Sequence, residues 1–150
     1  MIIESLKETE IPTIAELEKA SFSKPWSEHS IKSSFESVSC KFFTAKENGR
    51  IVGYIGLSVA ADEGYILNVA VFPEQRGKGI GKALVKFLLE KYNNELSFLT
   101  LEVRPSNTAA VRLYSSFGLE KAGERKNYYS HPTENALLLT KYFNSVKENC

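Results

Sequence analysis

A glycine-rich run, Gln75-Arg76-Gly77-Lys78-Gly79-Ile80-Gly81, is the stretch of this sequence whose residue types and spacing best suit ligand chemistry. Glycine lacks a Cβ atom, so the backbone can turn tightly there and a ligand can approach closely. Apolar residues 65–71 before the run predict a buried strand, and residues 80–91 behind it repeat apolar side chains at helical spacing. The first N–H groups of a helix lack internal partners and lie at its positive end. This order predicts a phosphate or diphosphate site, to which Arg76 and Lys78 add positive charge.

Two common phosphate-binding patterns fit the run poorly. A Walker loop, G-x-x-x-x-G-K-[ST], needs one more residue between its glycines, and Ala83 stands where a hydroxyl group should hold Mg²⁺. A dinucleotide fingerprint, G-x-G-x-x-G, needs glycine where this chain has Lys82. Glu102 does follow about twenty residues later, so a dinucleotide site stays open, as does a plain glycine-rich turn that caps a helix.

Two stretches resemble the GNAT superfamily of N-acetyltransferases, and the resemblance covers essentially the whole chain. Residues 76–81 match its acetyl-CoA signature, [QR]-x-x-G-x-[GA], position for position. Residues 101–118 are similar to the segment L-E-V-R-x-S-N-x-x-A-x-x-L-Y-x-x-x-G of the branch that acetylates protein N-termini. The ribosomal-protein-alanine N-acetyltransferases (RimI type) belong to this branch. Residues 25–27 and 126–129 match it as well.

The resemblance implies acetyl-CoA as co-substrate and no metal. It assigns the diphosphate to the backbone around the glycine run, and the pantetheine arm and thioester oxygen to the end of the preceding strand, which is expected to splay from the next strand. Asn107, which by position is an N-cap, is also expected to contact acetyl-CoA. The implied acetyl-CoA-binding residues are Val69, Ala70, Val71, Arg76, Gly77, Lys78, Gly79, Ile80, Gly81 and Asn107.

Glu102 and Tyr114 are the candidate catalytic residues. Glu102 is a charged residue near the end of an apolar strand, where ligands bind in open sheets, and it can act as general base, directly or through a water. Its plainer interpretation is a solvated carboxylate or a partner for Arg104. Tyr114 lies on a helix face that predicts packing, and the resemblance adds that its hydroxyl protonates the leaving thiolate.

The acceptor-binding residues are less specific in the sequence. Trp26, Tyr128 and Tyr129 are interpreted as core residues or as walls of a peptide slot. Glu134 contacts the substrate amine or caps a turn. Asn135 replaces a second acid of the ribosomal enzymes, which affects substrate choice rather than the acetyl-CoA site.

The periodicity of the chain predicts a single domain over residues 1–150 with the order β-α-α-β-β-β-α-β-α-β-β. Pro12 suits the first turn of the first helix, Ser27 is the expected N-cap of the second, and Gly118 ends the fourth. Residues 47–50 form a hairpin signal, so the sheet should begin antiparallel. The fold class is therefore mixed α/β (α+β), and the resemblance implies a seven-stranded mixed sheet with about four helices on both faces.

Composition bounds the class of protein. Hydrophobic residues make up 43% and charged residues 25%, as in ordinary globular proteins. The net charge of +1 predicts no attraction to nucleic acid or to anionic membranes. No transmembrane or signal segment is evident, so the chain is expected in the cytoplasm, as a monomer or weak dimer. Cys40 is expected to pack and Cys150 to be a free thiol, with no metal pattern.

These observations predict an acetyl-CoA-dependent N-acetyltransferase. Transfer should occur directly in a ternary complex, onto the α-amino group of a protein N-terminus, and most specifically onto an N-terminal alanine of a small-subunit ribosomal protein. One alternative is acetylation of a small-molecule amine such as a polyamine or an antibiotic. Another is a non-catalytic, CoA-binding regulatory module, against which the pair Glu102 and Tyr114 argues.

Overall fold

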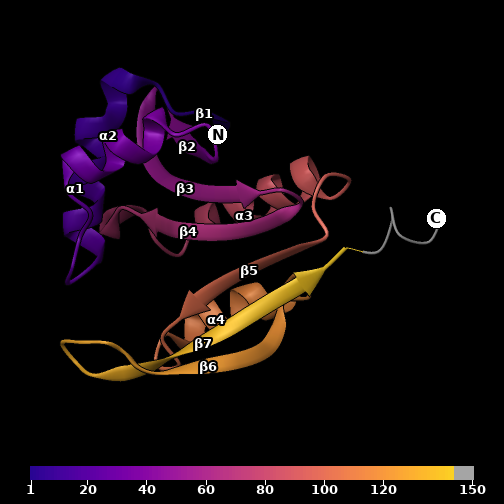
Figure 1. Ribbon diagram of the computed structural model, residues 1–150. Helices are drawn as coiled ribbons and strands as arrows, with labels where there is room; N and C mark the ends of the chain where they lie inside the picture. Colours follow the sequence, from indigo (N-terminus) through magenta and orange to yellow (C-terminus); the bar gives the residue numbers. More distant parts are fainter. Residues whose placement is uncertain (144–150) are drawn as a thin grey trace. The chain divides into compact units, whose positions relative to one another are not determined.

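The computed structural model describes residues 1–143, and Cys150 lies outside them (Figure 1). Two short 3₁₀ helices, η1 (Glu8–Glu10) and η2 (Pro73–Gln75), join the predicted elements. The α-helices are α1 (Ile11–Ser21), α2 (Glu28–Glu36), α3 (Ile80–Tyr92) and α4 (Thr108–Ser116). The strands are β1 (Ile2–Ser5), β2 (Cys40–Glu47), β3 (Arg50–Ala60), β4 (Glu63–Val71), β5 (Phe98–Val103), β6 (Glu120–Tyr129) and β7 (Glu134–Tyr142).

The strands form a seven-stranded sheet in the order β1-β2-β3-β4-β5-β7-β6. β2 is antiparallel to β1 and to β3, so the predicted antiparallel beginning is confirmed. β4 is parallel to β5, with Tyr65 opposite Thr100, and β7 lies antiparallel between β5 and β6. The predicted fold class, a mixed seven-stranded sheet with four helices, is confirmed.

The chain divides into two compact units. The first contains Met1–Val59 and Ile66–Leu89, and the second contains Ala60–Tyr65 and the chain from Glu90 onward. β4 contributes to both, because its first three residues belong to the second unit and the rest to the first. The single domain that the sequence predicts over the whole chain stays a prediction.

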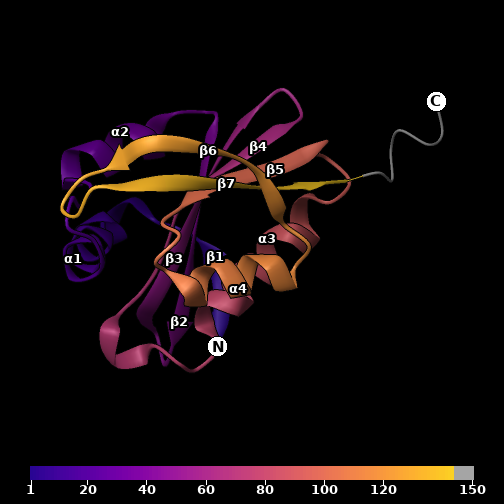
Figure 2. The ribbon, with the colours of Figure 1, turned by 90° about the horizontal axis from the view of Figure 1, so that it is seen from below.

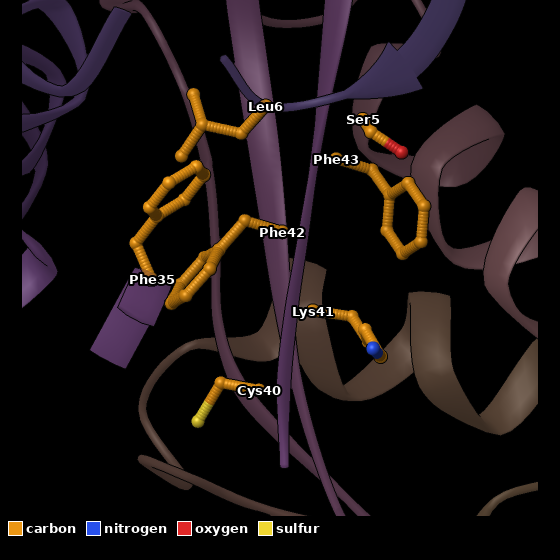
Figure 3. Close-up of a pocket in the computed structure, with 7 residues that line it drawn as sticks. All are labelled: Ser5, Leu6, Phe35, Cys40, Lys41, Phe42 and Phe43. Carbon is orange, nitrogen blue, oxygen red and sulfur yellow. The ribbon is translucent and has the colours of Figure 1, made fainter. Parts of the chain in front are cut away.

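In the first unit, helices cover both faces of the strands. Phe42 and Phe43 are consecutive on β2, so their side chains point to opposite faces, as Figure 3 shows beside a pocket where β1 ends. Phe42 packs into the core formed with α1 and α2. Phe43 instead contacts Phe87 of α3 edge-on, with ring centroids 5.1 Å apart. α3 also lies close on β3, because a Cβ atom at Gly53 would come within 3.3 Å of Leu84.

Glu18 is a fully buried carboxylate in this core, with no exposed surface. Its Oε2 accepts hydrogen bonds from the Tyr54 hydroxyl at 2.6 Å and from the Asn68 amide at 3.0 Å. Its Oε1 accepts one from the Trp26 backbone N–H at 2.9 Å. Burial raises the pKa of Glu18 above its ordinary range, although the three donors act in the opposite direction. The carboxylate thereby connects α1, β3, β4 and the segment between α1 and α2.

Replacing Glu18 by Ala should lower the free energy of unfolding by about 3 kcal/mol, because it leaves one buried donor and two partly buried donors without an acceptor. Urea unfolding monitored by circular dichroism measures this difference. Glu16→Ala is the matched control, since Glu16 is an exposed residue of the same helix and should change stability by less than about 0.5 kcal/mol. Equal effects of the two substitutions would contradict a structural role for the network.

In the second unit, α4 lies on one face of the strands β5, β7 and β6 (Figures 1 and 2). Asn107 caps α4 by accepting a hydrogen bond from the Ala110 backbone N–H at 3.2 Å, so the predicted N-cap is confirmed. The predicted N-cap Ser27 of α2, in the first unit, is confirmed in the same way by its bond from Ser30 at 3.1 Å. Gly118 follows α4 with φ of +88°, the conformation expected where a helix ends.

Candidate functional site

The glycine run joins η2 to α3 in the first unit. Gly77 and Gly79 have φ values of +80° and +82°, which L side chains rarely adopt. A Cβ atom at either position would meet nothing within 4 Å, so this side of the backbone is open. The first α-helical hydrogen bond at this end of α3 runs from the Ala83 N–H to the Gly79 carbonyl at 3.0 Å. The N–H groups of residues 80–82 precede it and are therefore without i−4 partners in the helix.

This geometry suits an anion. The helix start concentrates partial positive charge, and the open glycine backbone lets oxygen atoms come close to the N–H groups. A diphosphate fits this chemistry because its oxygens accept several N–H hydrogen bonds at once. Residues 77 and 79–81 can contribute such bonds with backbone atoms alone.

Arg76 and Lys78 use their side chains within the protein. Arg76 donates from Nε to the Val71 carbonyl at 2.9 Å and from Nη2 to the Ser21 hydroxyl at 3.2 Å. Lys78 donates to the Gln75 side chain at 3.1 Å. Arg76 therefore ties the end of α1 to the end of β4, and contact of either side chain with a ligand stays a prediction.

The end of β4 carries the other predicted acetyl-CoA residues of this unit. Ala70 is buried, and Val69 and Val71 are half-buried. Asn68 just before them is held by Glu18, and the Val71 carbonyl is held by Arg76. The Asn68 side chain and the Val71 carbonyl are thus each held by a hydrogen bond, on either side of residues 69 and 70. A role of this strand end in binding acetyl-CoA, and the splaying of the strand, remain predictions.

Glu102 is the centre of a cluster in the second unit. Its side chain is 6% exposed, and its Oε1 accepts a hydrogen bond from the Tyr65 hydroxyl at 2.9 Å. The same oxygen forms an ion pair with Nε of Arg125 at 3.2 Å. Its Oε2 is buried and has no hydrogen-bond partner among residues 1–143. A buried oxygen of this kind is uncommon, and it is available for a proton or a donor from a substrate.

Arg104, the partner that the sequence offered for Glu102, belongs to a different group. It donates to the Pro132 carbonyl at 2.8 Å and to the Ser130 carbonyl at 3.0 Å, and it pairs with Glu134 at 3.3 Å. Its guanidinium also lies 4.4 Å from the centroid of the Tyr129 ring. Arg104 thus holds the turn between β6 and β7 instead of pairing with Glu102.

Tyr114 lies on α4 and is 7% exposed. Burial, and then the nearby Tyr129, raise the pKa of Tyr114 to about 12. The phenol therefore keeps its proton at neutral pH and is a hydrogen-bond donor. Because the pKa of this phenol lies above that of an ordinary thiol, donation of a hydrogen bond to a departing sulfur is easier than full proton transfer, and protonation of the thiolate stays a prediction.

Tyr128 and Tyr129 are adjacent residues at the end of β6, and their rings meet edge-on with centroids 5.0 Å apart. Tyr128 is 51% exposed, whereas Tyr129 is half-buried. Burial first, and then hydrogen bonding to the Glu102 carboxylate and its negative charge, raise the pKa of Tyr128. Burial and then the charge of Glu102 raise the pKa of Tyr129 to about 12. Both tyrosines therefore lie close to Glu102, and their role in acceptor binding stays a prediction.

Glu134 and Asn135 are both engaged within the second unit. Glu134 accepts hydrogen bonds from the Ser106 backbone N–H at 2.7 Å and the Ser106 hydroxyl at 2.8 Å, besides pairing with Arg104. Asn135 accepts one from the Asn127 N–H at 3.0 Å, where β6 bulges. These contacts agree with the turn-capping interpretation of Glu134, and its contact with an amine stays a prediction.

Trp26 belongs to the first unit, in the segment between α1 and α2. It is partly buried against the core, and its backbone N–H is fixed by Glu18. The buried part of the Trp26 side chain therefore belongs to the core. A role for its remaining surface as a wall of a peptide slot stays a prediction. The pocket of Figure 3 is lined by none of the predicted site residues.

Sequence reasoning missed Tyr65 and Arg125. Residue pairs opposite each other in a sheet share a face, as do residues two apart on a strand. Tyr65 is opposite Thr100, two residues before Glu102. Arg125 is opposite Ala136, two residues before Leu138, which is itself opposite Glu102. All three side chains thus lie on one face, but only the strand order and register reveal it.

Residues 1–143 contain no group of three or more His, Cys, Asp or Glu side chains placed to hold a metal ion. None of the helices in that range has the length and apolar character needed to cross a membrane.

Comparison with known proteins places these features in context. The sequence profile of the acetyltransferase (GNAT) family matches residues 11–119. The ribosomal protein bS18-alanine N-acetyltransferase of Escherichia coli K12 is 34% identical over 128 residues, 85% of this chain and 86% of that protein. The Haemophilus ducreyi enzyme of the same name is 32% identical over 147 residues, 94% of this chain and 99% of that protein. A crystal structure of the Escherichia coli ribosomal-protein-S18-alanine N-acetyltransferase matches with a TM-score of 0.92 at 32% identity, over 99% of this chain and 97% of that one.

Proposed function

Because the chain belongs to the acetyltransferase (GNAT) family and is thus an acetyl-CoA-dependent N-acetyltransferase, we propose that its acceptor is the α-amino group of a protein N-terminus. The specific acceptor we propose is an N-terminal alanine of a small-subunit ribosomal protein. The observation that carries this proposal is the similarity to bS18-alanine N-acetyltransferases at 32–34% identity over most of both chains.

Membership of the family, together with the chemistry of the residues, supports the following roles for residues of the two units. The backbone of residues 77–81 binds the diphosphate, and the backbone of residues 69–71 holds the pantetheine arm. Acetyl-CoA, when bound, supplies the thioester whose C–S bond breaks as the new amide bond forms. Glu102 accepts a proton from the attacking amine, directly or through one water. Tyr114 donates a hydrogen bond to the departing sulfur, which stabilises the negative charge that develops there.

An α-amino group matches this machinery better than a lysine side chain does. Its pKa is about 7.7–8.0, so a carboxylate needs to remove a proton from an amine that is already partly neutral near pH 7.5. A lysine ε-amino group has a pKa of about 10.4 and is almost fully protonated there. Glu102 therefore suits the first kind of amine.

The experiment compares acceptors with labelled acetyl-CoA. A short peptide with a free N-terminal alanine and an internal lysine should be labelled at its α-amino group, and kcat/KM should rise with pH up to about 8 as that amine loses its proton. The same peptide with a blocked N-terminus is the control and should remain unlabelled. Labelling confined to the lysine, to polyamines or to antibiotics would contradict the proposal. Mass analysis of a labelled cell lysate then identifies the natural acceptor.

A further inference from the structure

We propose that Tyr65 and Arg125 are positioning residues that hold Glu102 by Oε1, and so leave Oε2 as the oxygen that accepts the proton of the acceptor amine. This inference rests on the proposed function of Glu102 as general base. It names two further residues for the reaction and separates the roles of the two carboxylate oxygens.

The contacts at Glu102 are unequal. Oε1 has two partners, the Tyr65 hydroxyl at 2.9 Å and the Arg125 guanidinium at 3.2 Å, and the Tyr128 hydroxyl also lies near this carboxylate. Oε2 has no hydrogen-bond partner among the described residues although it is buried. A buried polar atom without a hydrogen-bond partner is uncommon in folded proteins. Such features cluster where a ligand or reacting group completes the contact.

Fixing one oxygen fixes the other. A carboxylate can rotate about its last carbon–carbon bond, and rotation exchanges two chemically equivalent oxygens. Two donors on Oε1, one of them charged, select a single orientation, because charge-assisted contacts are stronger than neutral ones. Catalysis by proton transfer depends on this kind of pre-set geometry. The base therefore has its accepting lone pairs placed before the amine arrives.

Tyr65 and Arg125 suit the role for different reasons. Burial, and then Glu102 itself, raise the pKa of Tyr65 above its ordinary value, so its hydroxyl keeps its proton and remains a donor. Arg125 carries a guanidinium group, which donates N–H hydrogen bonds and accepts none. Its side chain is 56% exposed and lies 5.9 Å from the centroid of the Tyr128 ring, so it reaches Glu102 from the solvent side of the cluster.

The proton balance is simple. The amine nitrogen forms its bond to the acetyl carbon and loses one proton to Oε2, directly or through one water. Glu102 then becomes a neutral carboxylic acid, and it returns the proton to water before the next turnover. Tyr65 and Arg125 keep their protons throughout, so they are neither acids nor bases in the reaction.

A double-mutant comparison tests the assignment with an N-terminal-alanine peptide and acetyl-CoA as substrates. Tyr65→Phe and Arg125→Gln should each lower kcat by about tenfold, while KM for acetyl-CoA changes less than about twofold. In a Glu102→Gln background, neither substitution should lower kcat further, because a positioning residue acts through Glu102. The controls are Tyr142→Phe, which alters a tyrosine that is 71% exposed, and Lys121→Gln, which breaks an exposed ion pair on the same strand as Arg125.

The outcomes separate failure of this inference from failure of the proposed function. Equal losses of kcat in the native and Glu102→Gln backgrounds would mean that Tyr65 and Arg125 support the fold and do not act through Glu102. An unchanged kcat in the native background would mean that they do not position Glu102. Either result overturns the inference. If the native enzyme acetylates the peptide and Glu102→Gln lowers kcat, these results leave the proposed function intact. If the native enzyme leaves the peptide unlabelled, or Glu102→Gln keeps the native kcat, the proposed function itself fails.

Discussion

Replacing Gly79 by Glu is expected to abolish measurable acetyl-CoA binding. The substitution places a negative side chain on the open side of the backbone, where the diphosphate is proposed to lie. It also puts an L residue at a φ of +82°, which costs about 1–2 kcal/mol and distorts the N–H groups that should bind the ligand. Isothermal titration with acetyl-CoA should show a loss of at least about 100-fold in affinity.

Gly49→Glu is the matched control for this change. Gly49 lies in the turn between β2 and β3 with φ of +79°, and a Cβ atom there also meets nothing within 4 Å. The two variants therefore share charge, bulk and backbone strain, and differ in position. Gly49→Glu should bind acetyl-CoA as the native protein does. Equal affinity in both variants would place the diphosphate elsewhere.

Replacing Tyr114 by Phe is expected to lower kcat by about 100-fold and to leave acetyl-CoA affinity unchanged. Phe fills nearly the same volume in the buried site and removes only the hydroxyl group. The loss should therefore appear in the step where charge develops on sulfur and not in binding. Steady-state kinetics together with titration of acetyl-CoA separate the two effects.

A thioester analogue with a better leaving group provides the internal check on Tyr114. Its thiolate needs less stabilisation, so the difference in kcat between Tyr114→Phe and the native enzyme should shrink. A difference that stays constant would indicate that the hydroxyl supports the fold or the acetyl-CoA pose. An unchanged kcat with acetyl-CoA would remove Tyr114 from the mechanism.

The elements around the predicted acetyl-CoA site were predictable because their signals are local. Glycines at positive φ, a buried strand before them and an amphipathic helix after them all lie within thirty residues of one another. The N-caps Ser27 and Asn107 were predictable for the same reason, since a cap bonds to an N–H three residues away. The roles of these residues toward acetyl-CoA came from family resemblance.

The surroundings of Glu102 were not predictable, because they depend on register between strands distant in the sequence. Tyr65 and Arg125 are 37 and 23 residues away from Glu102, and nothing in their local sequence marks them as partners. Glu18 presents the same difficulty, since its helix gives no sign that three donors from other segments surround its carboxylate. Arg104 is close in sequence to Glu102, yet its side chain pairs with Glu134 at the start of β7.

The Arg76 side chain joins α1 to β4, and this contact limits which residues of the glycine run can vary in sequence. If main-chain amides bind the anion as proposed, exchange of the side chains at 78 or 80 should alter packing or surface charge and keep those amide contacts. Gly77 and Gly79 are the positions least tolerant of substitution, because their positive φ values disfavour L side chains. Loss of Arg76 should loosen the junction between α1 and β4, because its side chain bonds to Ser21 and to the Val71 carbonyl.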